Sequence, residues 1–477
     1  MISGGLAGFA GKHVLLLQGP LGPFFRRLGD DLRTAGARVT KINFNGGDWL
    51  FYPGQAVIYR RRLDEWPAFF QRFLAEQKVD VVMLFGDCRP IHRKAHEIAL
   101  AHGVEICVFE EGYVRPDYVT LERLGVNGHS QVPRAPMFYR CIPAYRAQDP
   151  LPVGNSFWHA AAWATLYYSA SILGRPIFRH YLHHRPLGAR EVLPWLRALW
   201  RKPLYAHRER GMQQRLETEL SEKFFLVPLQ VHCDAQVRVH SGYRSVEDFI
   251  RQTLRSFAAH APADTHLVIK HHPMDRGYTD YGNSIALQAR KLGVSNRVHY
   301  IHDQHLPTLL QHARGVEVIN STVGMSALHH RTPVKVTGSA IYDIRGLTYA
   351  GTLDNFWQAA AHTTVDHELY RRFHAYLVEH TQINGNFYKA LAIPGSRAGL
   401  AWETLPEQPA ARPQEAGPAW ALAQGLQPVP VATDPWSLGT TARLLAPVHS
   451  ARYRESANQP LPRWHTLHPA GGQVHEA

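Results

Sequence analysis

Asp234 is the first residue whose type and position suggest chemistry. It follows an apolar stretch, Phe224–Val231, that is typical of a buried strand, and Gln230 and His232 lie four and two residues before it. A carboxylate at the end of such a strand can act as a nucleophile or stabilise an oxocarbenium-like centre. The same pattern also fits an Asp that caps a helix N-terminus, so the residues alone leave both interpretations open.

A pair of adjacent acids, Glu110 and Glu111, ends a second apolar stretch and is followed by Arg115. A carboxylate in this position can serve as a general base that deprotonates an acceptor hydroxyl. A solvated ion pair between these acids and Arg115 is the alternative.

Two further loops contain groups that bind phosphate, and each of them follows an apolar strand. The second loop also opens a helix, whose free N–H groups attract anions. The residues concerned are Lys270, His271, His272 and Pro273 in one loop, and Asn320, Ser321 and Thr322 in the other. Each loop alone fits an ordinary helix cap or a packed histidine, but the two together favour a nucleotide-binding segment.

A fourth loop, near the start of the chain, holds Gln18, Gly19 and Gly22 between a strand and a helix. Its glycines allow the backbone to approach a ligand closely. The loop lacks the lysine of a P-loop and does not match GxGxxG, so phosphate binding and a simple tight turn both remain open.

The elements that must position these loops are alternating strands and helices. Short, nearly continuous apolar runs alternate with helical periodicity in residues 1–150 and again in residues 223–403, which predicts an α/β fold with parallel sheets covered on both faces. Residues 151–222 predict aromatic and basic helices without strands. Residues 404–477 hold 11 of the 32 prolines and predict a largely disordered tail.

The composition limits the partners and the location. The 477 residues carry a net charge of +13, which predicts attraction to an anionic partner such as nucleic acid, a membrane surface or a phosphorylated substrate. Four scattered cysteines suit neither a disulfide scaffold nor a CxxC-type zinc site. The start of the chain lacks a signal-peptide pattern, and the apolar runs in residues 150–174 are too interrupted for a membrane span, so we expect a cytoplasmic protein.

Six strings between about residue 14 and residue 350 occur in an order that resembles the capsule polysaccharide biosynthesis family, specifically its KpsS-type retaining β-Kdo transferases. The strings are QGPLGPFFRRLGDDLR, NFNGGDWLFYPG, FEEGYVRPDYVTLE, VPLQVHCDAQVRVHS, IKHHPMDRGYTDYG and INSTVGMSALHHRTPVKVTGSAIYDIRGLT. The resemblance implies a GT-B architecture, in which two Rossmann-like domains face one another across a cleft. Residues 1–150 would then bind the acceptor and residues 223–403 the donor.

The resemblance also implies the reaction and its residues. The donor would be CMP-Kdo and the acceptor lysophosphatidylglycerol, so that the product starts a poly-Kdo linker. Asp234 matches the position of the proposed nucleophile, and Glu110 aligns better than Glu111 with the proposed acceptor base. His272, Pro273, Ser321 and Thr322 match the elements that hold the CMP phosphate. No DxD-like pair lies near the donor strands, and we expect neither a metal nor another cofactor.

The helical segment suggests a second use for the positive charge. Arg175, Arg179, Arg185, Arg190, Arg197, Arg201 and Lys202 would meet lipid headgroups, and Trp158, Trp163, Trp195 and Trp200 would lie at the bilayer interface. We therefore expect peripheral attachment to an anionic inner membrane, contacts with other capsule assembly and export proteins, and no nucleic acid. The alternatives are a helical segment that only joins the two domains, a transferase with another donor or acceptor, and a non-catalytic export or scaffold protein.

Overall fold

The structure is a computed structural model that describes residues 5–143, 149–181 and 192–402. The chain divides into a unit of residues 1–408 and a unit of residues 409–477, and all of the described residues belong to the first unit. The predicted disordered tail, residues 404–477, therefore lies outside the described residues, as do Arg185 and Arg190 of the helical segment.

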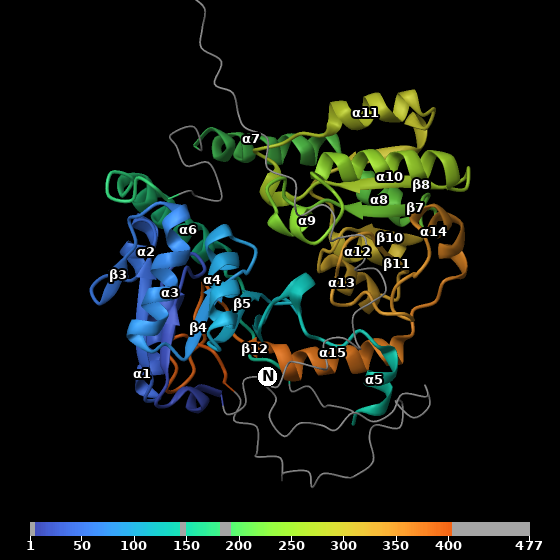
Figure 1. The fold of residues 1–477 in the computed structure, drawn as a ribbon. Coiled ribbons are helices and arrows are strands. Elements are labelled where there is room, and N and C mark those ends of the chain that lie inside the picture. Colours follow the sequence, from blue (N-terminus) through green and yellow to red (C-terminus); the bar gives the residue numbers. More distant parts are fainter. Residues whose placement is uncertain (1–4, 144–148, 182–191, 403–477) are drawn as a thin grey trace, which may run out of the picture. The chain divides into compact units, whose positions relative to one another are not determined.

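The first sheet has a parallel core with an antiparallel edge (Figure 1). Its strand order is β12-β6-β5-β4-β1-β2-β3. The bounds are β1 His13–Leu16, β2 Arg38–Asn43, β3 Ala56–Ile58, β4 Val81–Phe85, β5 Glu105–Glu111, β6 Tyr118–Arg123 and β12 Gln382–Asn384. The pairs β5–β6 and β6–β12 are antiparallel, and the other neighbours are parallel.

The second sheet is parallel throughout and has the order β11-β10-β7-β8-β9. The bounds are β7 Phe224–Pro228, β8 His266–Lys270, β9 Val298–Ile301, β10 Gly315–Val318 and β11 Val334–Val336. Strands β7 and β10 are buried along their whole length, as expected for strands covered on both faces. The predicted α/β fold with two Rossmann-like sheets is thus confirmed.

Amphipathic helices cover the sheets. In α10, Ser245 accepts a hydrogen bond from the Asp248 backbone as the N-cap, and Phe249, Leu254 and Phe257 form part of the buried face. The helices associated with the first sheet are α1 Phe24–Thr34, α2 Gly46–Phe51, α3 Trp66–Gln77 and α4 Pro90–Ala101. Those of the second sheet are α9 Ala235–Val239, α10 Val246–His260, α11 Gly282–Lys291, α12 Leu306–His312, α13 Val323–His329 and α14 Leu353–Ala359.

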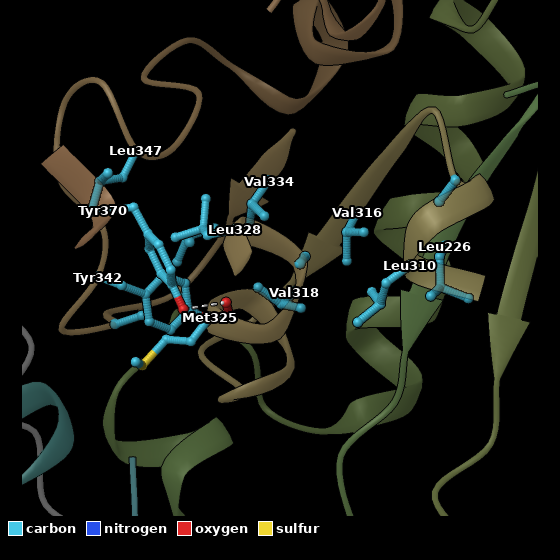
Figure 2. Packing of buried hydrophobic residues seen from close by; sticks show 14 of the residues in the cluster. Leu226, Leu310, Val316, Val318, Met325, Leu328, Val334, Tyr342, Leu347 and Tyr370 are labelled. Carbon is cyan, nitrogen blue, oxygen red and sulfur yellow. Dashed lines mark hydrogen bonds between the residues drawn. The ribbon is translucent and has the colours of Figure 1, made fainter. Parts of the chain in front are cut away.

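Figure 2 shows one side of the second sheet's core, where side chains of β7, β10 and β11 meet those of the helices and loops that follow. Val316 and Val318 are fully buried there. Tyr370, from α15 (His367–Thr381), donates a hydrogen bond from its hydroxyl to the Met325 carbonyl at 3.3 Å. This core fixes the loops at the carboxyl ends of β7 and β10.

The segment between the two sheets is helical where it is described, as the sequence predicts. It contains α6 Phe157–Leu173, α7 Val192–Arg208 and α8 Met212–Glu217, after α5 Pro136–Cys141. No helix of the described residues is long and apolar enough to cross a membrane.

The chain returns to the first sheet at its far end, which the sequence did not predict. Strand β12 pairs with β6, and Phe387 and Leu400 lie in the core of the first sheet. The structure therefore differs from the expected segment 223–403, because residues 382–402 pack with the N-terminal half. These short pieces gain their structure from strand pairing and burial rather than from a local pattern.

Candidate active site

Each sheet has one point where the strand order reverses, and such points form crevices at the carboxyl ends of the strands. In the first sheet the reversal lies between β1 and β4, and in the second between β7 and β10. Gln18 follows β1, and Gln230 and Asn320 follow β7 and β10. The sequence-predicted loops therefore do gather at the edges where ligands bind in such sheets.

Asp234 lies at the second of these points and caps α9. Its Oδ1 accepts from the Gln236 backbone N–H at 2.9 Å, and its Oδ2 accepts from Gln230 Nε2 at 3.0 Å. Gln230 Nε2 also donates to Asn320 Oδ1 at 3.0 Å, across the reversal point. The capping alternative is thus observed, and it leaves the carboxylate partly exposed and fixed in orientation.

Two unsatisfied acceptors belong to residues that bond to Asp234. Within the described part of the chain, the buried Oε1 atoms of Gln230 and Gln236 have no hydrogen-bond partner. Buried acceptors are rarely left unpaired, so a ligand that donates hydrogen bonds here would complete the network.

Glu110 ends β5 and has the properties of a general base. Its Oε1 accepts from the Glu111 backbone N–H at 3.0 Å, and its Oε2 accepts from Asn127 Nδ2 at 3.4 Å. Burial, joined by the charges of Glu111 and Asp87, raises the pKa of Glu110 to about 7. Glu111, in contrast, accepts a hydrogen bond from the Tyr388 hydroxyl at 2.8 Å. Of the two acids, Glu110 is therefore better suited to take a proton near neutral pH.

Cys88 connects the surroundings of Glu110 and Asp234, and sequence reasoning missed it. Its pKa is raised by burial and then by the negative charges of Asp87, Glu110 and Asp234. Both predicted acids therefore lie within electrostatic reach of one thiol. Cys88 Sγ also lies 3.4 Å from His240 Nε2, although the two residues are 152 positions apart.

Asp87, Cys88 and His240 form a cluster that could hold a metal ion, since one ligand atom of each lies within 4.8 Å of the others. Carboxylate, thiolate and imidazole are the ligand types that zinc prefers. The same groups already satisfy one another: Cys88 Sγ donates to Asp87 Oδ1 at 3.3 Å, and Asp87 Oδ2 accepts from the Val126 backbone at 3.2 Å. The sequence held no signal for this cluster, because its cysteine and histidine are distant along the chain.

The end of β8 and the loop that follows it, with Lys270, His271, His272 and Pro273, contain both buried and exposed residues. Lys270 is buried, donates from Nζ to the His302 carbonyl at 2.9 Å, and has a pKa lowered by burial. His271 is buried too, and burial lowers its pKa to about 4. His272 is partly exposed and accepts from the Met274 backbone through Nδ1 at 3.1 Å, and Pro273 is exposed. Within this loop, His272 is thus the partly exposed histidine, and an imidazole can donate a hydrogen bond to a phosphate.

The loop after β10 presents two hydroxyls. Ser321 and Thr322 are partly exposed, and Ser321 Oγ accepts from the Val323 backbone at 3.3 Å. Gly324 must be a glycine, because a Cβ there would lie 2.3 Å from the Tyr342 hydroxyl. The close packing of this turn holds both hydroxyls near Asn320.

The glycines of the first loop serve packing. A Cβ on Gly19 would lie 2.8 Å from the Phe25 ring, and Gly22, with φ +105°, faces the Trp163 ring of α6. This matches the tight-turn alternative. Arg115 is exposed and donates from Nε to the Gly112 carbonyl at 3.1 Å.

The helical segment exposes part of its predicted interface. Trp158 and Trp200 are 75% and 56% exposed, and Leu173 and Leu199 of the same segment are exposed as well. Trp163 is instead partly buried and donates from Nε1 to the Tyr388 carbonyl at 2.9 Å. The side chain of Trp195 lies outside the described residues. Arg175, Arg179 and Lys202 are exposed, whereas Arg201 donates to the Arg276 carbonyl at 2.8 Å.

Comparison with known proteins gives the family. A model of the capsule polysaccharide biosynthesis protein family matches residues 80–388. The capsule polysaccharide export protein KpsS of Escherichia coli is 41% identical over 80% of this chain and 97% of its own length. The capsule polysaccharide modification protein LipB of Neisseria meningitidis serogroup B is 42% identical over 81% and 94%.

Among solved structures, Thermosulfurimonas dismutans KpsC, a beta Kdo 2,7 transferase, matches with a TM-score of 0.39 and 14% identity over 80% of this chain and 94% of its own. That likeness is too distant to carry information about the reaction. The sequence matches are close and span most of the described residues, and on their strength the chain belongs to the capsule polysaccharide biosynthesis protein family.

Proposed function

We propose that this chain is a retaining glycosyltransferase that moves Kdo from CMP-Kdo to lysophosphatidylglycerol during capsule assembly. The observation that carries the proposal is Glu110, a strand-end carboxylate whose pKa is raised to about 7 and whose charge acts on Cys88 together with that of Asp234. The family membership supports the proposal, and the resemblance implies that Asp234 is the nucleophile.

Two displacements account for retention. In the first, a carboxylate oxygen of Asp234 bonds to the anomeric carbon while the bond from that carbon to the CMP phosphate breaks, and CMP leaves. In the second, the acceptor hydroxyl attacks the same carbon, Glu110 takes the hydroxyl proton, and the bond to Asp234 breaks. His272 and the hydroxyls of Ser321 and Thr322 would stabilise the charge on departing CMP.

The acceptor and the membrane give roles to the helical segment. The segment exposes aromatic and leucine side chains together with Arg175 and Arg179, and such side chains suit the surface of an anionic bilayer, where a lysolipid acceptor resides. We expect peripheral attachment to the inner membrane and transfer that needs no metal.

The decisive experiment is an assay with purified protein, CMP-Kdo and lysophosphatidylglycerol, with the linkage determined by NMR. We expect a β-linked product, and an inverted linkage would contradict the double displacement. Asp234→Asn and Asp234→Ala should abolish transfer while CMP still binds, since Asp234 supplies the nucleophile rather than the CMP contacts. Full activity in both variants would exclude Asp234 as the nucleophile.

One observation favours a second candidate, since the Escherichia coli relative is called an export protein. A non-catalytic export or scaffold role predicts no product with any donor and capsule assembly that survives loss of Asp234. A panel of nucleotide sugars and lipid acceptors, read by mass spectrometry, separates this role from a transferase that uses another donor or acceptor.

A further inference from the structure

Arg89 lies at the reversal point of the first sheet, and none of the roles above involves it. It follows β4 and directly precedes α4. Its Nη1 donates to Gln18 Oε1 at 2.6 Å, and its guanidinium lies over the Phe85 ring, 5.5 Å from the centroid. The side chain is partly exposed and held in one orientation from two sides.

Gln18 is itself fixed, which in turn fixes Arg89. The Gln18 side chain is buried, and its Nε2 donates to the Tyr181 hydroxyl at 2.8 Å, the Tyr167 hydroxyl at 3.2 Å and Asp48 Oδ2 at 3.3 Å. Asp48 can only accept from Nε2 and Arg89 can only donate to Oε1, so these two charged neighbours set the orientation of the amide, and the Tyr181 hydroxyl also donates to Oε1 at 3.1 Å. Tyr167 belongs to α6 and Tyr181 follows it, so the helical segment helps to position this guanidinium.

The charge of Arg89 is not neutralised by an acidic partner. No carboxylate of the described residues lies within ion-pair distance of it, and the group that it contacts is a neutral amide. Its positive charge opposes the rise in the pKa of Glu110, although burial of Glu110 has the larger effect. Arg89 follows β4, and β4 pairs in parallel with β5, the strand whose end holds Glu110. A charged, fixed and partly exposed guanidinium at this edge of the sheet is suited to bidentate binding of a carboxylate or phosphate.

We infer that Arg89 binds an oxyanion of the acceptor close to the hydroxyl that Glu110 deprotonates, and that Gln18 is a positioning residue for Arg89. The inference rests on the proposed function, because the place of Glu110 assigns the anion to the acceptor. The candidate donor contacts, Gln230, Asn320 and Ser321, belong instead to loops of the second sheet.

The test compares an anionic and an uncharged acceptor. Transfer rates are measured with lysophosphatidylglycerol and with a monoacylglycerol of the same acyl chain. In Arg89→Gln, the KM for lysophosphatidylglycerol should rise on the order of 10- to 100-fold, as expected for a lost charge-assisted pair. The KM for CMP-Kdo and the rate with monoacylglycerol should stay as in the wild type. Arg89→Lys, which keeps the charge but not the fork, should show a smaller rise.

Arg93→Gln is the matched control, because Arg93 is an exposed residue of the same helix and should leave both rates unchanged. Equal losses with both acceptors, or a raised KM for CMP-Kdo, would overturn the inference. If the wild type transfers to no acceptor, the proposed function fails, and calorimetry with glycerol 3-phosphate and glycerol then tests Arg89 alone. The inference is supported if the protein binds glycerol 3-phosphate more tightly than glycerol and if Arg89→Gln weakens this binding. It is refuted if Arg89→Gln binds glycerol 3-phosphate as the wild type does. Circular dichroism confirms that each variant is folded.

Discussion

Removing the carboxylate of Glu110 tests the proposed chemistry most directly. Burial, joined by nearby acids, raises the pKa of Glu110 from 4.5 to about 7, which means that the folded protein disfavours the carboxylate by roughly 3 kcal/mol. A base must be deprotonated to act, so the acceptor kcat/KM should reach a plateau above this pKa. Below about pH 7 it should fall about tenfold per pH unit. A glutamate with an ordinary pKa would give a flat profile over the same range.

The assay is the rate of transfer at subsaturating acceptor between about pH 5.5 and 8.5. Glu110→Gln should lower the plateau by about 10²- to 10⁴-fold and remove the acid limb. Glu111→Gln should keep the limb and move it to lower pH, because one negative neighbour of Glu110 is removed. A limb that persists unchanged in Glu110→Gln would refute the assignment of the base.

Stability gives an independent reading of the same pKa. Between pH 4.5 and 7 the folded protein keeps a proton on Glu110 that the unfolded chain has lost, so the free energy of unfolding falls as pH rises through this range. Glu110→Gln cannot lose this proton. Relative to the wild type it should therefore gain up to about 3 kcal/mol in the free energy of unfolding between about pH 4.5 and 8, measured by urea denaturation. An equal pH dependence in both proteins would show that the pKa is ordinary.

Three further results are expected. Gly46→Ala should lower the free energy of unfolding by about 1–3 kcal/mol, because its Cβ would lie 2.0 Å from the Ala170 carbonyl oxygen of α6. Gly242→Ala is the control and should leave the free energy of unfolding unchanged, because a Cβ there would meet open space. Urea denaturation measures the free energy of unfolding of both variants. The double change Trp158→Ala and Trp200→Ala should reduce the fraction of protein that sediments with anionic liposomes, and Leu287→Ala, which removes an exposed side chain of α11, should not. Dialysis against EDTA should leave transfer intact, and activity that is lost and then restored by zinc would instead assign Asp87, Cys88 and His240 to a metal.

The alternation of strands and helices was predictable because each buried strand is a short apolar run and each covering helix has its own periodicity. Strands β3 and β12 have three residues each, too few for any pattern, and they form because a neighbouring strand pairs with them. The sequence did not predict the strand Tyr118–Arg123, which forms by antiparallel pairing with β5 after a connection of residues 112–117.

The acids of the candidate site were predictable for a simple reason: they end apolar strands, and the carboxyl ends of parallel strands meet at one edge. Cys88 and His240 were not, since nothing local marks a contact between residues 152 positions apart. The sequence also could not separate His271 from His272. Their burial differs because His271 bonds to the Tyr300 hydroxyl at 2.7 Å, and that hydroxyl belongs to another strand.

The two reversal points are built alike and differ in the charge that they present. At each one, a glutamine after the first strand bonds across the gap to a residue after the strand on the other side: Gln18 to Arg89 and Gln230 to Asn320. The first glutamine donates to Asp48 and accepts from Arg89, and therefore holds a cation at the end of β4, the strand beside β5 and Glu110. The second donates to Asp234, and therefore holds a carboxylate. A fixed cation suits an anionic acceptor, whereas a fixed carboxylate suits an electrophilic sugar carbon. The two reversal points would therefore bind the two substrates of the transfer separately, the acceptor at the first sheet and the donor at the second.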